Sequence, residues 1–482
     1  MSRLRAIFGW IFARKRRTIP LFLLVATSVW LASFFLRRER LRAERDALIA
    51  DLRTRDGVVT AEDVNARMDK RAPRLVHLLR AHVLLDETRF EIVRAGASPE
   101  WKEHLGDWLP PGEPVPRAEL GALQKLEKPD ADPKHDAVIA GIRPAFAELE
   151  KALAAPPAPV GLWHLPYECP TGSMAGNYEP ISALTAACTG ALYRSLGAGR
   201  PHDAFHWALL RMRHSRIADG DYLLSSRDHE TRSLHYSCRL LAEILARHDP
   251  SEREFERIDA FLRDAPQFSF RQGMLGDRAN AFGLVDEMKL EEAASPFVTD
   301  LAQGRPLWSL RALAWLRRGP LFATTRLEDQ IWVLRHYDDF LAASDDLGPA
   351  GDSAARRLIA ENAFFSSHSF WGSFLPAFTY LRELRHRHLA NAHMIRGALR
   401  INRHRERRGR LPDSLAEVAD KSWSPADELL YGAAGLRYEK TADGFRLRPA
   451  DPRPAPEELP LLPIQFEIKY TPGRLPKPEA KK

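Results

Sequence analysis

The sequence predicts a mostly α-helical protein with an N-terminal transmembrane helix, a stalk, an α-helical hairpin array and a small C-terminal β-hairpin module. Three observations lead to this prediction. Residues 18–36 carry no charged side chain. Most later segments repeat apolar residues at helical spacing, and strand-like alternation is confined to the end of the chain. The chain has 482 residues, 45% of them hydrophobic and 28% charged, which is ordinary for a folded globular protein.

The charge-free run is predicted to cross a membrane. It reads TIPLFLLVATSVWLASFFL over residues 18–36. About 19 residues at about 1.5 Å each reach about 28 Å, close to the hydrocarbon thickness of a bilayer. A basic N-terminal tail, residues 1–17, precedes the run, and five arginines follow it over residues 37–45. Membrane lipid is therefore the predicted partner of residues 18–36.

Two alternatives to an anchor are a cleaved signal peptide and a buried core helix. Ala26 and Ser28 have the small-x-small spacing of a signal-peptide cleavage site. However, the apolar run continues to Leu36, which a cleaved signal does not need. A buried core helix fits poorly with basic clusters at both ends. The anchor is favoured over both.

The basic residues also predict an orientation. Six Lys and Arg residues precede the run and five lie over residues 37–45, and the block Arg14–Arg17 is unbroken. The side with more basic residues tends to stay in the cytoplasm. We therefore expect a single-pass inner-membrane protein with a cytoplasmic N-terminus and a periplasmic or extracytoplasmic body.

The remaining chain divides by composition and turn signals. The predicted segments are a charged helical stalk (37–56), a helical subdomain (57–154), a Pro-rich linker (155–161), a helical-pair domain (162–408), a β-containing module (409–470) and a disordered tail (471–482). The stalk has a thin stripe of Leu41, Leu48 and Leu52, typical of a stalk or a short coiled coil, and Gly57 is expected to end it. A strong amphipathic helix is predicted over 73–95, and the Pro- and Trp-rich residues 97–117 read as a loop.

The helical-pair domain contains the same helix–turn–helix pattern twice. ALYRSLGAGRPHDAFHWALLRM and SLHYSCRLLAEILARHDPSEREFERIDAFLRDAP each contain two helical patterns around a short turn. In both turns a proline is placed to open the second helix. Such stacked pairs offer surfaces to other proteins, so another protein is a predicted partner.

The last long helix is predicted over 376–408, followed by β-structure. Two strands, Leu436–Glu439 and Phe445–Arg448, are joined by a turn containing Asp443 and Gly444. A third strand is predicted over Ile464–Tyr470.

The C-terminal stretch has a distinct pattern: a basic helix, then G-x-x-P-x-x-L, then a strand pair around D-G-F. It is carried by Gly409, Leu411, Pro412, Leu415, Tyr438, Gly444 and Phe445. This pattern resembles the end of an uncharacterised family of signal-anchored, mostly helical bacterial envelope proteins. It is also distantly similar to the globular part of type II secretion pseudopilins. Residues 271–288 resemble a helical element of the same family. In a pseudopilin the anchor continues directly into this helix, whereas here a long helical region separates the two. The resemblance implies no activity.

The net charge of +7 suits anionic partners. The predicted helix is rich in arginine between Arg382 and Arg410. One interpretation is an anionic partner bound through residues 382–410. The other, which we favour, is a solvated amphipathic face. Aromatic residues are not interleaved with these arginines, so base stacking is unsupported and no sequence-specific nucleic acid is expected.

No motif identifies a reaction or a cofactor, so no catalytic, cofactor-binding or metal-binding residue is assigned. His202 and His206 are four residues apart on a predicted helix, with Asp203 and His214 nearby, but ordinary surface or core histidines are the simpler interpretation. The segment HETRSLH, 229–235, lacks the second histidine of a zinc motif because Ser233 takes its place.

The three cysteines, Cys169, Cys188 and Cys238, form no CxxC pair. Buried free thiols are expected. His164, Tyr167 and Glu168 share a loop with Cys169, where cysteine–histidine chemistry would require a pairing in space that the sequence cannot show.

The sequence therefore predicts a membrane-tethered helical scaffold or interaction protein of the bacterial cell envelope, with no catalysis assigned. One alternative is a metal- or cysteine-dependent hydrolase, which a cleft joining His202, His206 and an acid would favour. Another is an assembly component related to secretion pseudopilins.

Overall fold

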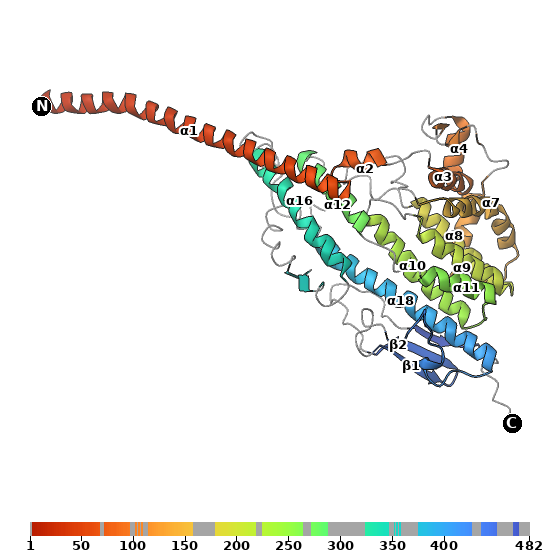
Figure 1. Cartoon of the computed structure of the whole chain (residues 1–482). Coiled ribbons are helices and arrows are strands. Elements are labelled where there is room, and N and C mark those ends of the chain that lie inside the picture. The colour runs from red at the N-terminus through yellow and green to blue at the C-terminus, as the bar shows by residue number, and fades with distance from the viewer. Residues whose placement is uncertain are drawn as a thin grey trace. The chain divides into compact units, whose positions relative to one another are not determined.

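The computed structural model is mostly helical, with a small three-stranded antiparallel sheet (Figure 1). It forms two compact units: Met1–Asp63 with Arg278–Asp338, and Val64–Asp277 with Asp339–Lys482. The residues that the structure describes are 2–67, 72–96, parts of 102–108, 114–157, 179–217, 224–263, 271–287, 323–346, parts of 351–357, 375–426, 435–450 and 466–471.

Helix α1 runs from Ser2 to Asp56, so the predicted anchor and stalk form one helix. Gly57 ends it as predicted, with a φ of 72° that favours glycine. Helix α2, Ala61–Arg67, begins where the acidic first turn predicted it. No helix among the described residues combines the length and the apolar character needed to cross a membrane.

The stalk part of α1 packs within its own unit. Leu52 forms a small apolar cluster with Phe282 of α12 (Arg271–Glu287) and Leu334 of α16 (Ala323–Asp345). The apolar stripe of the stalk is thus covered by side chains from this chain.

A buried ion-pair network fixes the end of α1. The side chain of Arg278 has no exposed surface, and its guanidinium donates to the Asp56 carboxylate at 2.9 Å and to the Val58 carbonyl at 2.7 Å. Asp338 lies 3.4 Å from Arg278 and also accepts from Arg55 at 2.6 Å. A buried guanidinium requires such partners, because desolvation would otherwise make the charged form costly.

The second unit begins with α3 (Pro73–Leu85), α4 (Glu87–Ala95), α6 (Arg117–Gln124) and α7 (Lys134–Ala154). The single helix predicted over 73–95 is broken at Asp86. Its backbone is extended and its carboxylate accepts the Thr88 N–H at 3.0 Å, as at a helix N-cap. The short helix α6 was not predicted.

The helical pairs are present as predicted. Helices α8 (Glu179–Gly197) and α9 (Pro201–Ser215) pack on each other, and α9 packs on α10 (Leu224–Leu245). Helix α11 spans Glu252–Arg263. Pro201 opens α9 at its first position, which suits a residue without an N–H. The described residues between 180 and 400 contain no strand.

The second turn differs from its prediction. Ser251 caps α11: its hydroxyl accepts the Glu254 N–H at 3.4 Å, and the Glu254 carboxylate accepts the Ser251 N–H at 2.7 Å. This reciprocal capping box sets the start of the helix, so Pro250 precedes the cap instead of opening the helix.

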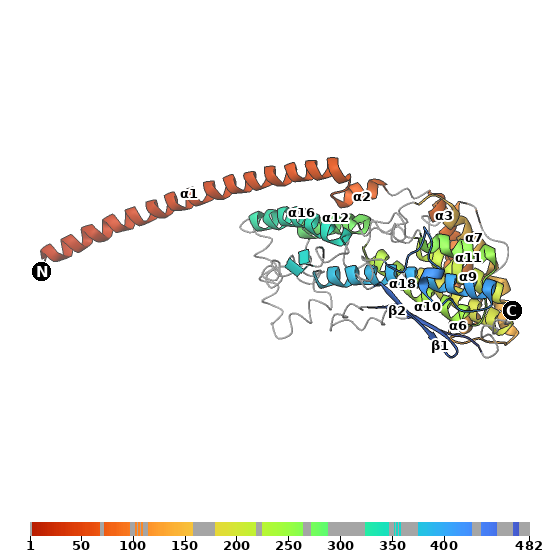
Figure 2. The same ribbon diagram turned by 60° about the horizontal axis from the view of Figure 1, so that its bottom comes forward.

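Helix α18 (Leu375–Arg408) lies along α10 and contacts α11 and strand β2 (Figure 2). The sheet order is β1-β2-β3, with β1 at Leu436–Thr441, β2 at Gly444–Pro449 and β3 at Phe466–Lys469. Both pairs are antiparallel, so the predicted hairpin and third strand are confirmed.

Gly444 has a different role from the predicted one. It pairs with Thr441 within the ladder and is not among the glycines with positive φ. A Cβ atom there would collide with the Ile468 carbonyl oxygen. The glycine therefore permits the close approach of β3.

Several predictions fall outside the described residues. They include residues 158–161 of the linker, 472–482 of the tail and the loop 164–169. The predicted domain boundaries stay predictions.

Candidate functional site

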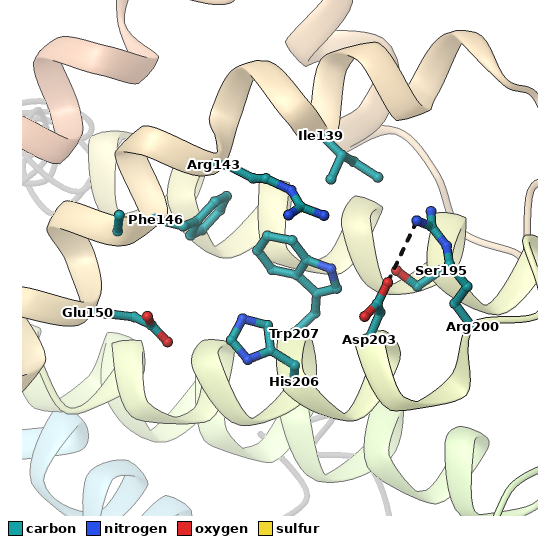
Figure 3. A pocket seen from close by; sticks show the side chains of 10 residues that line it. Ile139, Arg143, Phe146, Glu150, Ser195, Arg200, Asp203, His206 and Trp207 are labelled. Carbon is teal, nitrogen blue, oxygen red and sulfur yellow. Dashed lines mark ion pairs between the residues drawn. The ribbon is translucent and has the colours of Figure 1, made fainter. Parts of the chain in front are cut away.

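The candidate site is a pocket of about 320 Å³ between α7, the end of α8 and α9 (Figure 3). Its lining comes from segments far apart in the sequence: Ile139, Arg143, Phe146, Ala147, Glu150, Ser195, Arg200, Asp203, His206 and Trp207.

Aromatic side chains form the apolar part of the pocket. Phe146 and Trp207 are almost fully buried and pack edge to face, with ring centroids 4.9 Å apart. His206 is exposed and stands edge to face with Trp207 at 5.4 Å. Edge-to-face packing holds both rings in one orientation, so the apolar surface is preformed.

Charged groups surround this surface. Arg200 pairs with Asp136 at 2.9 Å and lies 3.7 Å from Asp203. Arg143 and Glu150 form no ion pair within the part of the chain that the structure describes. Figure 3 shows the Arg143 guanidinium above the Trp207 indole. It also shows Glu150 on the side of His206 that is away from Trp207.

The structure separates the two histidines proposed for a metal. His206 and Asp203 line the pocket, whereas His202 is exposed and its Nδ1 lies 3.1 Å from the Glu254 carboxylate. His214 is buried with its Nδ1 3.1 Å from the Thr185 hydroxyl. Among the described residues, no three His, Cys, Asp or Glu side chains are grouped so as to hold a metal ion.

The segment 229–235 lies in α10. Ser233 is buried, and the His235 ring contacts the amide of Asn391. Burial, together with the charges of Arg239 and Arg387, lowers the pKa of His235. This histidine is part of the contact between α10 and α18.

Cys188 and Cys238 are free and buried, as expected. Burial raises the pKa of the Cys188 thiol and raises that of Cys238 to about 12, against a smaller opposing effect of the Arg211 charge. Both therefore stay protonated near neutral pH, which makes them poor nucleophiles. Cys169, with His164, Tyr167 and Glu168, lies outside the described residues.

Much of the basic helix is buried. Five of its arginines expose less than a tenth of their surface: Arg385, Arg387, Arg396, Arg400 and Arg405. The predicted solvated face is therefore wrong for these five side chains. Arg407 and Arg408 are exposed, at the end of α18.

Acids of this chain compensate the buried arginines. Asp259 of α11 accepts from Arg396 at 2.9 Å and from Arg400 at 2.5 Å. Burial alone would raise the pKa of Asp259, but the hydrogen bonds and charges of Arg400 and Arg396 outweigh it and hold the pKa below its usual value. Asp249 pairs with Arg405 at 2.5 Å.

The same helix holds the C-terminal module. Arg400 donates to the Ser422 hydroxyl at 2.7 Å, and the Trp423 indole donates to the His393 carbonyl at 3.0 Å. The Tyr470 hydroxyl, after β3, donates to Asn402 at 2.7 Å. These polar groups are structural, since each joins α18 to a neighbouring element.

Sequence reasoning missed Arg143, Phe146, Glu150 and Trp207. None of them belongs to a recognisable motif within its own helix, and only the packing of α7 on α9 brings them together.

Comparisons with protein-family models, curated proteins and solved structures found no match.

Proposed function

We propose that the chain is a membrane-tethered helical scaffold or interaction protein of the bacterial cell envelope, with no catalysis assigned. One observation supports a membrane tether. The exposed large apolar side chains of α1 are Leu24, Val25, Val29, Trp30, Leu31, Phe35 and Leu36. Elsewhere in the described residues, only Tyr236 is a large hydrophobic residue with comparable exposure.

Exposed apolar surface is costly in water, at about 25 cal/mol per Å². Leu36 exposes 73% of its surface and Leu24 exposes 65%. A bilayer would remove this whole segment from water, and the flanking arginines would remain at the headgroups. The proposal places residues 18–36 in the inner membrane and the body outside the cytoplasm.

The scaffold part of the proposal rests on the second unit. Its helices build one large apolar core, and that core includes Phe445 and Ile468 of the C-terminal sheet. Such a body is suited to holding a partner in a fixed place. For an anionic partner of residues 382–410, the exposed arginines in the described part of the helix are Arg408 and Arg407, and Arg407 also lies 3.4 Å from the Glu252 carboxylate.

Removal of residues 1–38 tests the tether. We expect the truncated chain to be folded and to remain in the supernatant after ultracentrifugation of a cell lysate. The matched control removes residues 1–17 only and should stay with the membranes, because it keeps the charge-free run. A folded, monodisperse truncated chain that still sediments with membranes would contradict the proposal.

The hydrolase alternative is favoured by one observation, the shared pocket of His206, Asp203 and Glu150. His202 does not join them, and the two described thiols are held protonated. A His206→Ala variant tests this alternative. Loss of an ester or peptide hydrolysis shown by the full-length chain would favour the enzyme over the scaffold.

A further inference from the structure

We propose that the pocket between α7 and α9 binds a short polypeptide segment of a partner protein that presents a carboxylate, an apolar side chain and a basic side chain in that order. The inference rests on the proposed interaction function and names the chemistry of its partner. It follows from two charged side chains of the pocket, Arg143 and Glu150, that form no ion pair among the described residues, and from the aromatic surface between them.

Arg143 forms the positive end of the pocket. It is exposed and, within the described residues, has no acidic partner, whereas the other lining arginine, Arg200, is held by Asp136 and Asp203. In Figure 3 the Arg143 guanidinium lies above the Trp207 indole, whose nitrogen is turned towards the space between Arg143 and Asp203. The Arg143 guanidinium and the Trp207 indole N–H thus face the same part of the pocket. A carboxylate placed there could accept hydrogen bonds from both.

Glu150 forms the negative end. It lies on α7 two turns after Arg143, about 10 Å along the helix axis at about 1.5 Å per residue. Its carboxylate forms no ion pair in the described part of the chain, although its charge acts on Arg213 and favours the charged form of that side chain. A basic side chain is the complementary group, and an ion pair at each end would fix the direction of the bound segment.

The aromatic surface lies between the two ends. Trp207 is 6% exposed and Phe146 is 4% exposed, so both rings are held by the core and expose little surface. Six of the ten lining residues are polar or charged, so the apolar part of the pocket is small and fixed in position. An apolar side chain placed between the acid and the base of the partner would cover it, and the volume of about 320 Å³ suits a segment of a few residues.

Two tripeptides test the inference by fluorine NMR with the full-length chain in detergent. The probe is acetyl-Glu-(4-fluoro-Phe)-Lys-amide, and the neutral reference is acetyl-Gln-(4-fluoro-Phe)-Gln-amide. We expect the charged peptide to bind about threefold to tenfold more tightly, as for partly exposed ion pairs. Detergent without protein provides the blank.

Variants assign the effect to the pocket. Arg143→Gln and Glu150→Gln should each reduce the preference for the charged peptide, and the double variant should abolish it. Arg253→Gln is the matched control, because Arg253 is also exposed and without an ion pair in the described residues but lies on α11 outside the pocket. Circular dichroism confirms that each variant is folded.

Two outcomes would overturn the inference: equal or absent binding of both peptides, or a preference unchanged by Arg143→Gln. Carbonate extraction of membranes from the same cells reports the tether separately, so failure of the peptide test and failure of the proposed tether are distinguishable.

Discussion

Buried charges are the feature that stands out at the scale of single residues. Arg278 has no exposed surface, and Asp259 exposes 6% of its surface. Each is held by two or more opposite charges or carbonyl groups. Once such a group is buried, removing its partner leaves an uncompensated charge, which costs far more than the pair contributes.

Asp259→Ala should therefore destabilise the chain by about 3–5 kcal/mol, because it leaves Arg396 and Arg400 buried without their carboxylate. Chemical denaturation followed by circular dichroism measures this. Asp413→Ala is the control: Asp413 pairs with Lys440 at 2.5 Å, but its side chain is 74% exposed. Its loss should have a far smaller effect on stability, because water screens this ion pair. Equal losses of stability in the two variants would show that Asp259 does not compensate buried arginines.

The Asp259 ion pairs also predict a dependence on pH. Folding lowers the pKa of Asp259 from its usual value of 3.8, so its stabilisation is complete above that value. It is lost as the pH falls below about 3.8 and through the lower folded pKa. Denaturation between pH 6 and pH 3 should show a loss of stability that is smaller in Asp259→Asn. A parallel loss in both proteins would contradict this.

The role of these arginines was not predictable from the helix that carries them. Helical periodicity assigns charged positions to solvent, and nothing in residues 376–408 shows an acid on α11. Arg396 and Asp259 are 137 residues apart in the chain. The same reasoning explains the missed pocket, since Arg143 and Trp207 come from different helices.

Local signals were reliable at the scale of elements. Gly57, the acidic first turn at Asp63 and the alternating residues of β1 and β2 each lie where the structure begins or ends an element. The predictions were wrong where a side chain competes with the helix, as Asp86 does between α3 and α4. No prediction was made for α6, which follows a Pro-rich stretch predicted to form a loop.

Helix packing gives a prediction at this scale. Gly190 of α8 faces α6, where a Cβ atom would collide with the Leu123 carbonyl. Gly190→Ala should lower the melting temperature, because the two helices must separate. Gly121→Ala in α6 is the matched control: nothing lies within 4 Å of its Cβ position, and alanine favours helix by about 0.5–1 kcal/mol. It should raise the melting temperature. A rise for both variants would show that α8 does not approach α6 closely.

At the scale of the molecule, the first unit combines remote segments. Met1–Asp63 joins Arg278–Asp338, and Arg278 closes the contact on Asp56. The sequence predicted a charged helical stalk or a short coiled coil there. It could not show the covering residues, which lie more than 200 positions away, as for Asp56 and Arg278 with a separation of 222. The predicted helical body with terminal strands was confirmed, since both depend on local periodicity.

The most direct test of the proposed tether and its orientation is protease protection in spheroplasts, with a tag at each end of the full-length chain. If residues 18–36 span the inner membrane with the body outside, added protease should remove the C-terminal tag. A short fragment carrying the N-terminal tag should survive and should stay with carbonate-washed membranes. Protection of the C-terminal tag until lysis, with loss of the N-terminal tag, would reverse the orientation. Protection of both tags in intact spheroplasts, or release of the N-terminal fragment by carbonate, would contradict the single-span tether itself.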